Sequence, residues 1–139
     1  MKQRHAFSFV SLLALVLSFL ALISTGKTVL LDETDNHTRV VLYVGDSLSV
    51  RLKSNPTTGF SWSVTDLPVF LQQLDSKTET GKRGRIGEPG SQYFTFKAKL
   101  AGESTLALNY ARAFEKNTPP AKTFVVSISV EPRPGPRVP

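Results

Sequence analysis

Apolar side chains alternate with polar ones along most of the chain after residue 27, and this period of two constrains the fold more than any other feature. A β-strand points successive side chains to opposite faces, whereas an apolar helix face repeats every 3.6 residues, a period that this region lacks. The alternation is found at 48–52, 60–64, 94–96, 106–110 and 124–130, and each of these segments is expected to form a strand. Two further strands are expected at 40–44 and 67–74.

About seven short strands in roughly 100 residues are typical of a two-sheet sandwich in which each strand has one apolar face. The sequence therefore predicts an all-β fold, an immunoglobulin-like antiparallel β-sandwich of about seven to eight strands. Trp62 shares a strand face with Phe60 and Val64, so we expect it in the core. The sandwich should span 27–131, and the proline-rich segment 132–139 should be a disordered tail.

The first 26 residues are typical of a secretory signal peptide. Lys2 and Arg4 are followed by an uncharged, apolar run at 6–23 and then by the small or polar residues Ser24-Thr25-Gly26. This order predicts export and cleavage after Gly26, which gives a secreted or periplasmic protein. The apolar run is close to the roughly 20 residues that span a bilayer, so an uncleaved amino-terminal membrane anchor is the alternative.

Composition argues against an enzyme. The chain has no cysteine, which rules out disulfides, a thiol nucleophile and thiolate metal ligands, and after cleavage its only histidine is His37, on an expected loop. Without residues 1–26, fifteen basic residues face eleven acidic ones, a net charge of +4 that is weak evidence for nucleic-acid binding. We expect no cofactor, no metal, no small-molecule substrate and no nucleic-acid partner.

Three connections between the expected strands have the composition of binding loops. They lie at 54–59, 80–91 and 111–121, which makes them alternate connections along the chain. In an immunoglobulin-like sandwich such connections can cluster at one end. We therefore expect one composite recognition surface on a rigid scaffold.

The first of these loops, SNPTTG at 54–59, is short, nearly uncharged and stiff. Pro56 fixes its own φ and restricts Asn55, while Thr57 and Thr58 are β-branched. Gly59 permits a positive φ. Such a loop loses little entropy on binding and suits insertion into a narrow cleft, although an ordinary strand connection would use similar turn-forming residues.

The run NPTTGF at 55–60, followed by Trp62, resembles the signature loop of the chagasin-like inhibitors of papain-family cysteine peptidases. The run GEPG at 87–90, followed by QYFTFKA at 92–98, is similar to the glycine-rich second loop of that family and the strand after it. RAF at 112–114 takes the place of the family's Arg-Pro-Trp motif. The resemblance extends over about 40–130.

This resemblance implies a reversible, competitive inhibitor, a monomer whose three loops fill the cleft of a papain-like cysteine peptidase. Thr57 and Thr58 would lie near the catalytic Cys and His of the peptidase, the second loop on the non-primed side, and the third loop on the primed side. The residues that the resemblance assigns to the peptidase-binding surface are Asn55, Pro56, Thr57, Thr58, Gly59, Phe60, Gly87, Glu88, Pro89, Gly90, Arg112, Ala113 and Phe114.

Two departures from the family pattern bear on affinity. Pro89 stands where a glycine is usual, and Ala113-Phe114 replaces the usual Pro-Trp. We expect the same binding mode with weaker affinity or a shifted target range. The basic stretch at 82–85 either steers the protein toward an acidic surface or is a solvated face. The rival functions are a non-inhibitory binding module for protein or carbohydrate and an envelope-associated structural protein.

Overall fold

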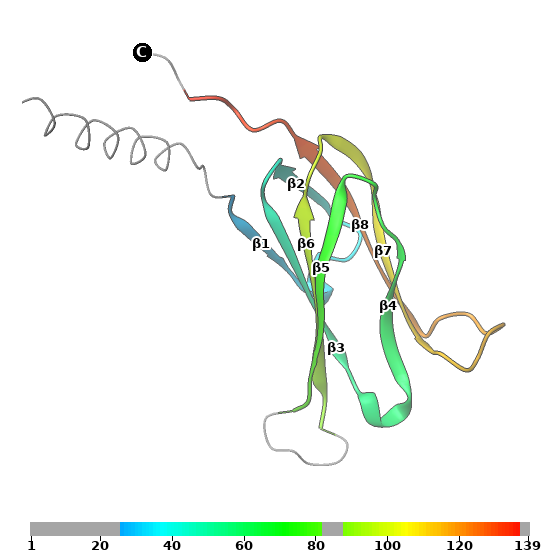
Figure 1. The fold of residues 1–139 in the computed structure, drawn as a ribbon. Helices are drawn as coiled ribbons and strands as arrows, with labels where there is room; N and C mark the ends of the chain where they lie inside the picture. The colour runs from blue at the N-terminus through cyan, green and yellow to red at the C-terminus, as the bar shows by residue number, and fades with distance from the viewer. Residues whose placement is uncertain (1–25, 82–87, 137–139) are drawn as a thin grey trace, which may run out of the picture.

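The computed structural model describes residues 26–81 and 88–136, which form two four-stranded β-sheets packed as a sandwich (Figure 1). The first sheet has the order β1-β3-β6-β5, with β1 at Thr28–Leu31, β3 at Ser47–Ser54, β6 at Gly90–Ala98 and β5 at Leu71–Glu79. The second has the order β2-β8-β7-β4, with β2 at Arg39–Tyr43, β8 at Lys122–Glu131, β7 at Gly102–Arg112 and β4 at Phe60–Asp66. The predicted all-β sandwich is thus confirmed.

Most neighbouring strands run antiparallel, as the sequence predicts, but the two amino-terminal strands do not. β1 joins β3 in parallel, and β2 joins β8 in parallel. Each therefore completes the edge of a different sheet. The alternating pattern cannot reveal this arrangement because the period of two is the same in parallel and antiparallel pairs.

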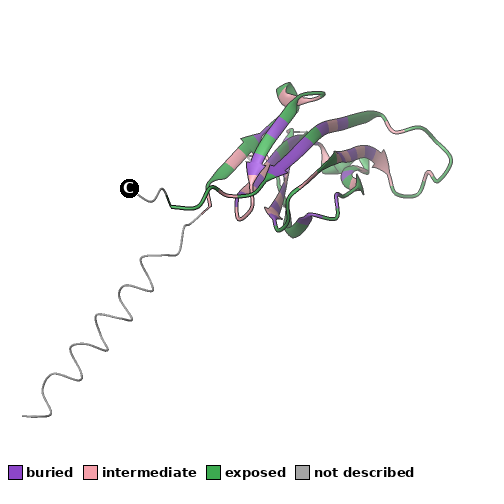
Figure 2. Ribbon diagram, turned by 90° about the horizontal axis from the view of Figure 1, so that it is seen from above, coloured by how far each residue is buried: buried purple, intermediate pink, exposed green. Residues whose placement is uncertain are grey.

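The core lies between the two sheets and consists of the inward-facing side chains of both. Along most strands buried residues alternate with more exposed ones (Figure 2). Trp62 is 5% exposed, and Phe60 and Val64 pack against the core from the same strand face, which confirms the expected placement of Trp62. Among the largest fully buried side chains are Phe96, Phe124, Leu42, Leu48 and Leu52.

One expected strand is placed wrongly. The sequence predicts a strand at 67–74, but β4 continues to Asp66 and β5 begins only at Leu71. Between them Pro68, which has no N–H for a strand ladder, accepts a hydrogen bond from the N–H of Leu71 (3.0 Å) and closes a turn. Phe70 is buried at this turn, and a Cβ added to Gly102 would come within 2.6 Å of its ring.

The described residues contain two single-turn 3-10 helices, η1 at Glu33–Asp35 and η2 at Pro56–Thr58. No helix in this part of the chain is long and apolar enough to cross a membrane. His37, the histidine expected on a loop, is exposed in the turn after η1 and has a positive φ of 64°. Apart from Gly26, the predicted leader lies outside the described residues.

Candidate functional site

The register of the strands brings the three candidate loops to one end of the sandwich. In the first sheet Ser54, the last residue of β3, pairs with Gly90, the first of β6. In the second sheet Phe60, the first residue of β4, pairs with Arg112, the last of β7. The β3–β4, β5–β6 and β7–β8 loops therefore leave the same end of the molecule; in Figure 1 the β3–β4 loop lies at the lower edge and the β7–β8 loop projects to the right. We call this end the loop face.

The β3–β4 loop is held by its own hydrogen bonds. Asn55 caps η2: its side-chain oxygen accepts from the backbone N–H of Thr57 (3.3 Å) and from the Thr57 hydroxyl (2.6 Å). The Thr58 hydroxyl donates to the carbonyl oxygen of Asn55 (2.7 Å). Pro56 occupies the first turn of η2, where a missing N–H costs nothing. The loop is exposed, yet its conformation is fixed from within.

Gly59 ends η2 in the left-handed conformation, with φ 77° and ψ −2°. Its N–H donates to the carbonyl oxygen of Pro56 (3.3 Å), which closes the turn. A side chain at this φ costs about 1–2 kcal/mol, so glycine is the residue that fits. The structure thus bears out the positive φ that the sequence allowed at this position.

Residues behind the loop fix its base. The hydroxyl oxygen of Tyr110, on β7, accepts a hydrogen bond from the N–H of Asn55 (3.0 Å). The Tyr110 ring stacks on Phe60, with centroids 5.3 Å apart, and contacts Trp62, at 5.1 Å. The indole N–H of Trp62 donates to the carbonyl oxygen of Lys53 (2.9 Å), just before the loop. A stack of core aromatics therefore supports both ends of the loop.

Gln92 is a supporting residue to which sequence reasoning gave no role. Its side chain is buried between the sheets, where its oxygen accepts from the N–H of Trp62 (2.7 Å). Its amide nitrogen donates to the carbonyl oxygen of the same residue (3.4 Å). The sequence does contain a signal for this role: Gln92 is a polar residue at the same alternate positions as the buried Phe94 and Phe96. A side-chain amide buried there needs hydrogen-bond partners.

Arg112 connects the β3–β4 loop to the β7–β8 loop. Its Nε donates to the carbonyl oxygen of Thr58 (3.2 Å), and its Nη1 forms an ion pair with Glu115 (3.0 Å). The guanidinium carbon lies 4.4 Å from the centroid of the Phe60 ring and 6.0 Å from that of Phe114. Arg112 is half-buried, and its guanidinium already joins the two loops in the free protein.

Phe114 projects from the β7–β8 loop. The residue is 73% exposed, and so is not tucked beneath the loop, while Ala113 beside it is also exposed. The nearest ring atom of Phe114 would lie 3.5 Å from a Cβ built on Gly59. The ring therefore stands next to the β3–β4 loop, available to a partner that covers both.

The β5–β6 loop is described only at its two ends. Gly90 is buried, and a Cβ there would lie 2.1 Å from the carbonyl oxygen of Glu79, so the strand pair tolerates only glycine. Pro89 is exposed and Glu88 half-buried. Gly87 and the basic stretch at 82–85 lie outside the described residues. The structure therefore brings three of the four expected residues of this loop to the loop face.

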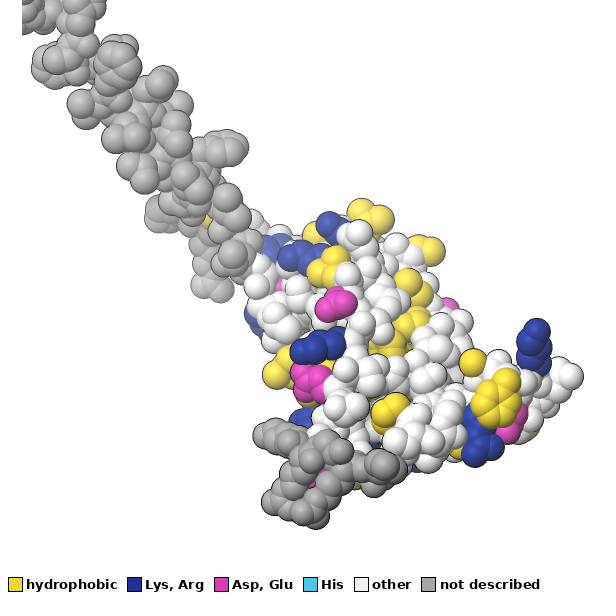
Figure 3. Space-filling view, turned by 60° about the horizontal axis from the view of Figure 1, so that its bottom comes forward, with side chains coloured by type: hydrophobic (Ala, Val, Ile, Leu, Met, Phe, Trp, Pro, Cys, Tyr) yellow, Lys and Arg dark blue, Asp and Glu magenta, His cyan; other side chains and the backbone are white. Residues whose placement is uncertain are grey.

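The described residues of the loop face form no catalytic arrangement. Thr57 and Thr58 donate their hydroxyl protons to amide and carbonyl oxygens of Asn55, which are not bases that could activate a nucleophile. No group of three or more His, Asp or Glu among the described residues is placed to bind a metal ion. In the space-filling view of this end, charged and hydrophobic side chains gather at the β7–β8 side, while the middle is largely uncharged (Figure 3).

A rigid β-sandwich from one end of which three loops leave, one of them stiff and uncharged, is typical of domains that bind another protein by shape complementarity. The model of the chagasin family, described as "Chagasin family peptidase inhibitor I42", matches residues 41–128. This protein therefore belongs to the chagasin family of peptidase inhibitors, whose members are inhibitors and not enzymes.

Similar proteins agree with this assignment. Amoebiasin-2 of Entamoeba histolytica is 28% identical over 118 residues, which cover 81% of this chain and 95% of amoebiasin-2. The crystal structure of the cysteine protease inhibitor EhICP2 from Entamoeba histolytica has the same fold, with a TM-score of 0.68, 20% identity and coverage of 78% of this chain and 99% of that one. The structure of PbICP-C in complex with falcipain-2 is similar with a TM-score of 0.51 and 23% identity; the match covers 76% of this chain and 100% of the PbICP-C chain.

Proposed function

We propose that this protein is an exported, reversible and competitive inhibitor of papain-like cysteine peptidases, and that the loop face fills the active-site cleft. The observation that carries the proposal is the internally braced β3–β4 loop, with Thr57 and Thr58 at its exposed turn and a second loop joined to it through Arg112. A loop that is already ordered loses little entropy on binding. The family assignment and the cysteine protease inhibitors of the same fold support the class of partner.

The braced turn also accounts for resistance to cleavage. A peptidase needs an extended substrate whose scissile carbonyl reaches the nucleophile, whereas residues 56–58 form a 3-10 turn that ends in a left-handed glycine. Straightening the turn would break the hydrogen bonds that Asn55 makes with Thr57 and Thr58. The loop therefore occupies the cleft without offering a bond in the geometry of attack, and dissociates intact.

Export is the second part of the proposal. It is supported by the basic start, the apolar run at 6–23 and the small residues before Lys27. We propose cleavage after Gly26 and a soluble, monomeric mature domain. Amino-terminal sequencing of the native protein should begin at Lys27; full-length protein that stays with membranes after a carbonate wash would show that the segment is an anchor.

The inhibitory function is tested by titrating papain with the purified protein and following its residual activity. Thr58→Arg should weaken inhibition by roughly thirty-fold or more, because leaving an unpaired charge in a tight interface costs about 2–5 kcal/mol and each 1.4 kcal/mol is about tenfold. The matched control is Thr28→Arg, an exposed threonine on β1 at the opposite end of the first sheet.

Both variants should melt like the parent protein, and only Thr58→Arg should lose inhibition. If papain keeps full activity at every ratio of the parent protein, the loops serve a non-inhibitory binding module. If a folded Thr58→Arg protein inhibits as well as the parent, the β3–β4 loop does not enter the cleft.

A further inference from the structure

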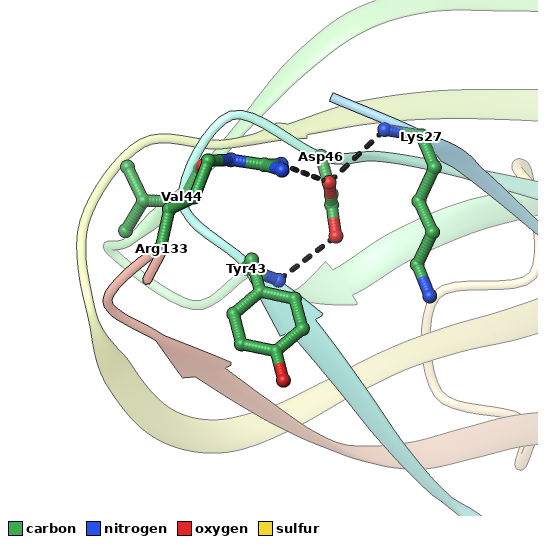
Figure 4. A network of polar contacts seen from close by, with 5 residues as sticks. All are labelled: Lys27, Tyr43, Val44, Asp46 and Arg133. Carbon is green, nitrogen blue, oxygen red and sulfur yellow. Dashed lines mark hydrogen bonds and ion pairs between the residues drawn. The ribbon is translucent and has the colours of Figure 1, made fainter. Parts of the chain in front are cut away.

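A second polar cluster lies at the end of the sandwich opposite the loop face, around Asp46 in the turn between β2 and β3 (Figure 4). The Asp46 side chain is fully buried. Its Oδ2 accepts from the N–H of Tyr43 (2.9 Å), and its Oδ1 accepts from the backbone nitrogen of Lys27 (3.1 Å) and from the guanidinium of Arg133. A buried carboxylate is stable only when its charge is compensated in this way.

Arg133 comes from the segment that the sequence expects to be disordered. Besides its ion pair with Asp46, its Nε donates to the carbonyl oxygen of Val44 (3.1 Å). The cluster therefore collects both ends of the described chain at one turn. The Arg133 side chain is thus held by the buried carboxylate and by the carbonyl oxygen of Val44.

The amino-terminal donor to Asp46 is the backbone nitrogen of Lys27, the residue after the expected cleavage point. Lys27 directs its backbone nitrogen at Asp46, while its side chain extends away from the carboxylate (Figure 4). Its carbonyl oxygen accepts from the N–H of Ser47 (2.8 Å), and β1 continues from there beside β3. Residue 27 is thus held by the domain itself, and it is the residue that follows the proposed cleavage point.

We propose that Asp46 is the binding site for the α-ammonium group that forms when the peptide bond between Gly26 and Lys27 is cut. The inference rests on the export proposed above. Hydrolysis adds one water: the new carboxylate stays on Gly26 with the leader, and the nitrogen of Lys27 becomes an amine that takes up a proton at neutral pH. The same atom that donates as a neutral amide in the uncut chain then donates as a cation.

The surroundings of residues 26 and 27 favour the charged contact between the new amine and Asp46. A Cβ on residue 26 would lie 2.0 Å from the carbonyl oxygen of Gly45, so the uncut chain passes this turn only because residue 26 is glycine. Cleavage removes that crowded residue and leaves the contact with Asp46 in place. Charged hydrogen bonds are roughly twice as strong as neutral ones, and burial of the carboxylate limits solvent screening.

Two charged groups act directly on the new amine. Asp46, on the β2–β3 turn, lies within hydrogen-bonding distance of it and attracts it; Arg133, after β8, repels it. The two donors approach the carboxylate from different sides (Figure 4), so the attraction acts over the shorter distance. The pKa of the amine should therefore rise above its ordinary range of about 7.7–8.0, and its contribution to stability should be present at neutral pH and lost as the pH rises through the raised pKa.

The test uses the protein as a cell makes it. The full chain is expressed in a host that exports it, the purified product is weighed by mass spectrometry, and its terminal amine is converted to a carbonyl by transamination, which leaves lysine side chains untouched. We expect a product that begins at Lys27, an amine that titrates above its ordinary range by NMR, and a melting temperature that falls by about 4–8 °C after transamination.

Two variants sharpen the result. In Asp46→Asn, transamination should no longer change the melting temperature. In Arg133→Gln, which keeps the carboxylate and removes the other cation, the loss on transamination should grow, and this variant decides the matter if Asp46→Asn does not fold. A product that begins elsewhere, or an amine of ordinary pKa whose removal leaves the melting temperature unchanged, would overturn the proposal. Inhibition of papain by the same samples is an independent readout, because the loop face lies at the other end.

Discussion

Replacing Phe114 with alanine should remove much of the binding contribution of the β7–β8 loop while leaving the fold intact. An aromatic side chain buries about 150–250 Å² when it is fully covered. Because Phe114 is 73% exposed, about 110 Å² of its surface is still available to a partner even at the lower end of that range. At roughly 25 cal/mol per Å² this corresponds to about 2.7 kcal/mol if a partner covers the ring completely, so a loss of about 1–3 kcal/mol, or about five- to 140-fold in affinity, is expected.

The effect on the free energy of unfolding should be much smaller. Inside the protein the ring lies beside Gly59 and at a distance from Arg112 (6.0 Å between the guanidinium carbon and the ring centroid), and most of its surface is exposed. Surface substitutions of this kind stay within about 0.5 kcal/mol, which shifts the melting temperature by no more than about 2–4 °C. Binding and stability therefore separate clearly at this position.

The assay is the inhibition constant against a papain-like peptidase, measured beside the thermal melting of each variant. Leu100→Ala is the matched control, since Leu100 is 62% exposed in the turn between β6 and β7 at the opposite end. Phe114→Trp should hold or improve affinity, because it restores the larger ring of the family pattern. A Phe114→Ala protein that melts much lower, yet inhibits normally while folded, would assign the ring to packing and refute the reasoning.

Three further predictions concern the supports of the two ends. Arg112→Gln removes the guanidinium that bridges the loops, so inhibition should weaken by about tenfold and the amide of Gly59 should exchange hydrogen faster; unchanged exchange would contradict the bridge. Gly59→Ala should lower the free energy of unfolding in urea by about 1–2 kcal/mol because of the positive φ, and no loss would mean that the turn has another conformation. Burial tends to raise the pKa of Asp46, but hydrogen bonds from Tyr43, Lys27 and Arg133 outweigh it and hold the pKa below its ordinary value. Stability from this group is therefore present above about pH 4 and lost as the pH falls through the lowered pKa, and Asp46→Asn should flatten that acid limb of the melting-temperature profile.

The strands that sequence could predict are those whose alternation is enforced by burial on one side. β3 and β8 place leucine, valine, isoleucine or phenylalanine at three or four successive alternate positions, and β6 does so at Phe94 and Phe96, so the sequence predicts a strand at each of these places. The sequence predicts this strand at 67–74 and not at its observed place because all residues of β5 after Leu71 are exposed. Without a buried face, LQQLDSKTE has no alternation of apolar and polar residues that would mark it as a strand. β1 was missed because its four residues follow directly on the predicted leader.

At the candidate site, sequence predicted which residues meet but not how they are used. The conformation of Gly59 followed from its residue type. The hydroxyls of Thr57 and Thr58 donate within the loop, to the side-chain and backbone oxygens of Asn55, so toward a partner they act as hydrogen-bond acceptors. Such pairings depend on side-chain distances across a turn, which no pattern of residue types determines.

The β3–β4 loop owes its position to the sheets more than to its own sequence. It is the point where the chain crosses from one sheet to the other, since Ser54 pairs in the first and Phe60 in the second. Packed sheets stand about 10 Å apart, so a crossing of this length has little freedom once both ends are paired. The partners in those pairs, Gly90 and Arg112, are themselves the boundaries of the other two loops. One register in each sheet therefore sets where all three loops leave the sandwich, and substitutions can tune individual contacts at the loop face without changing the order of the loops on it.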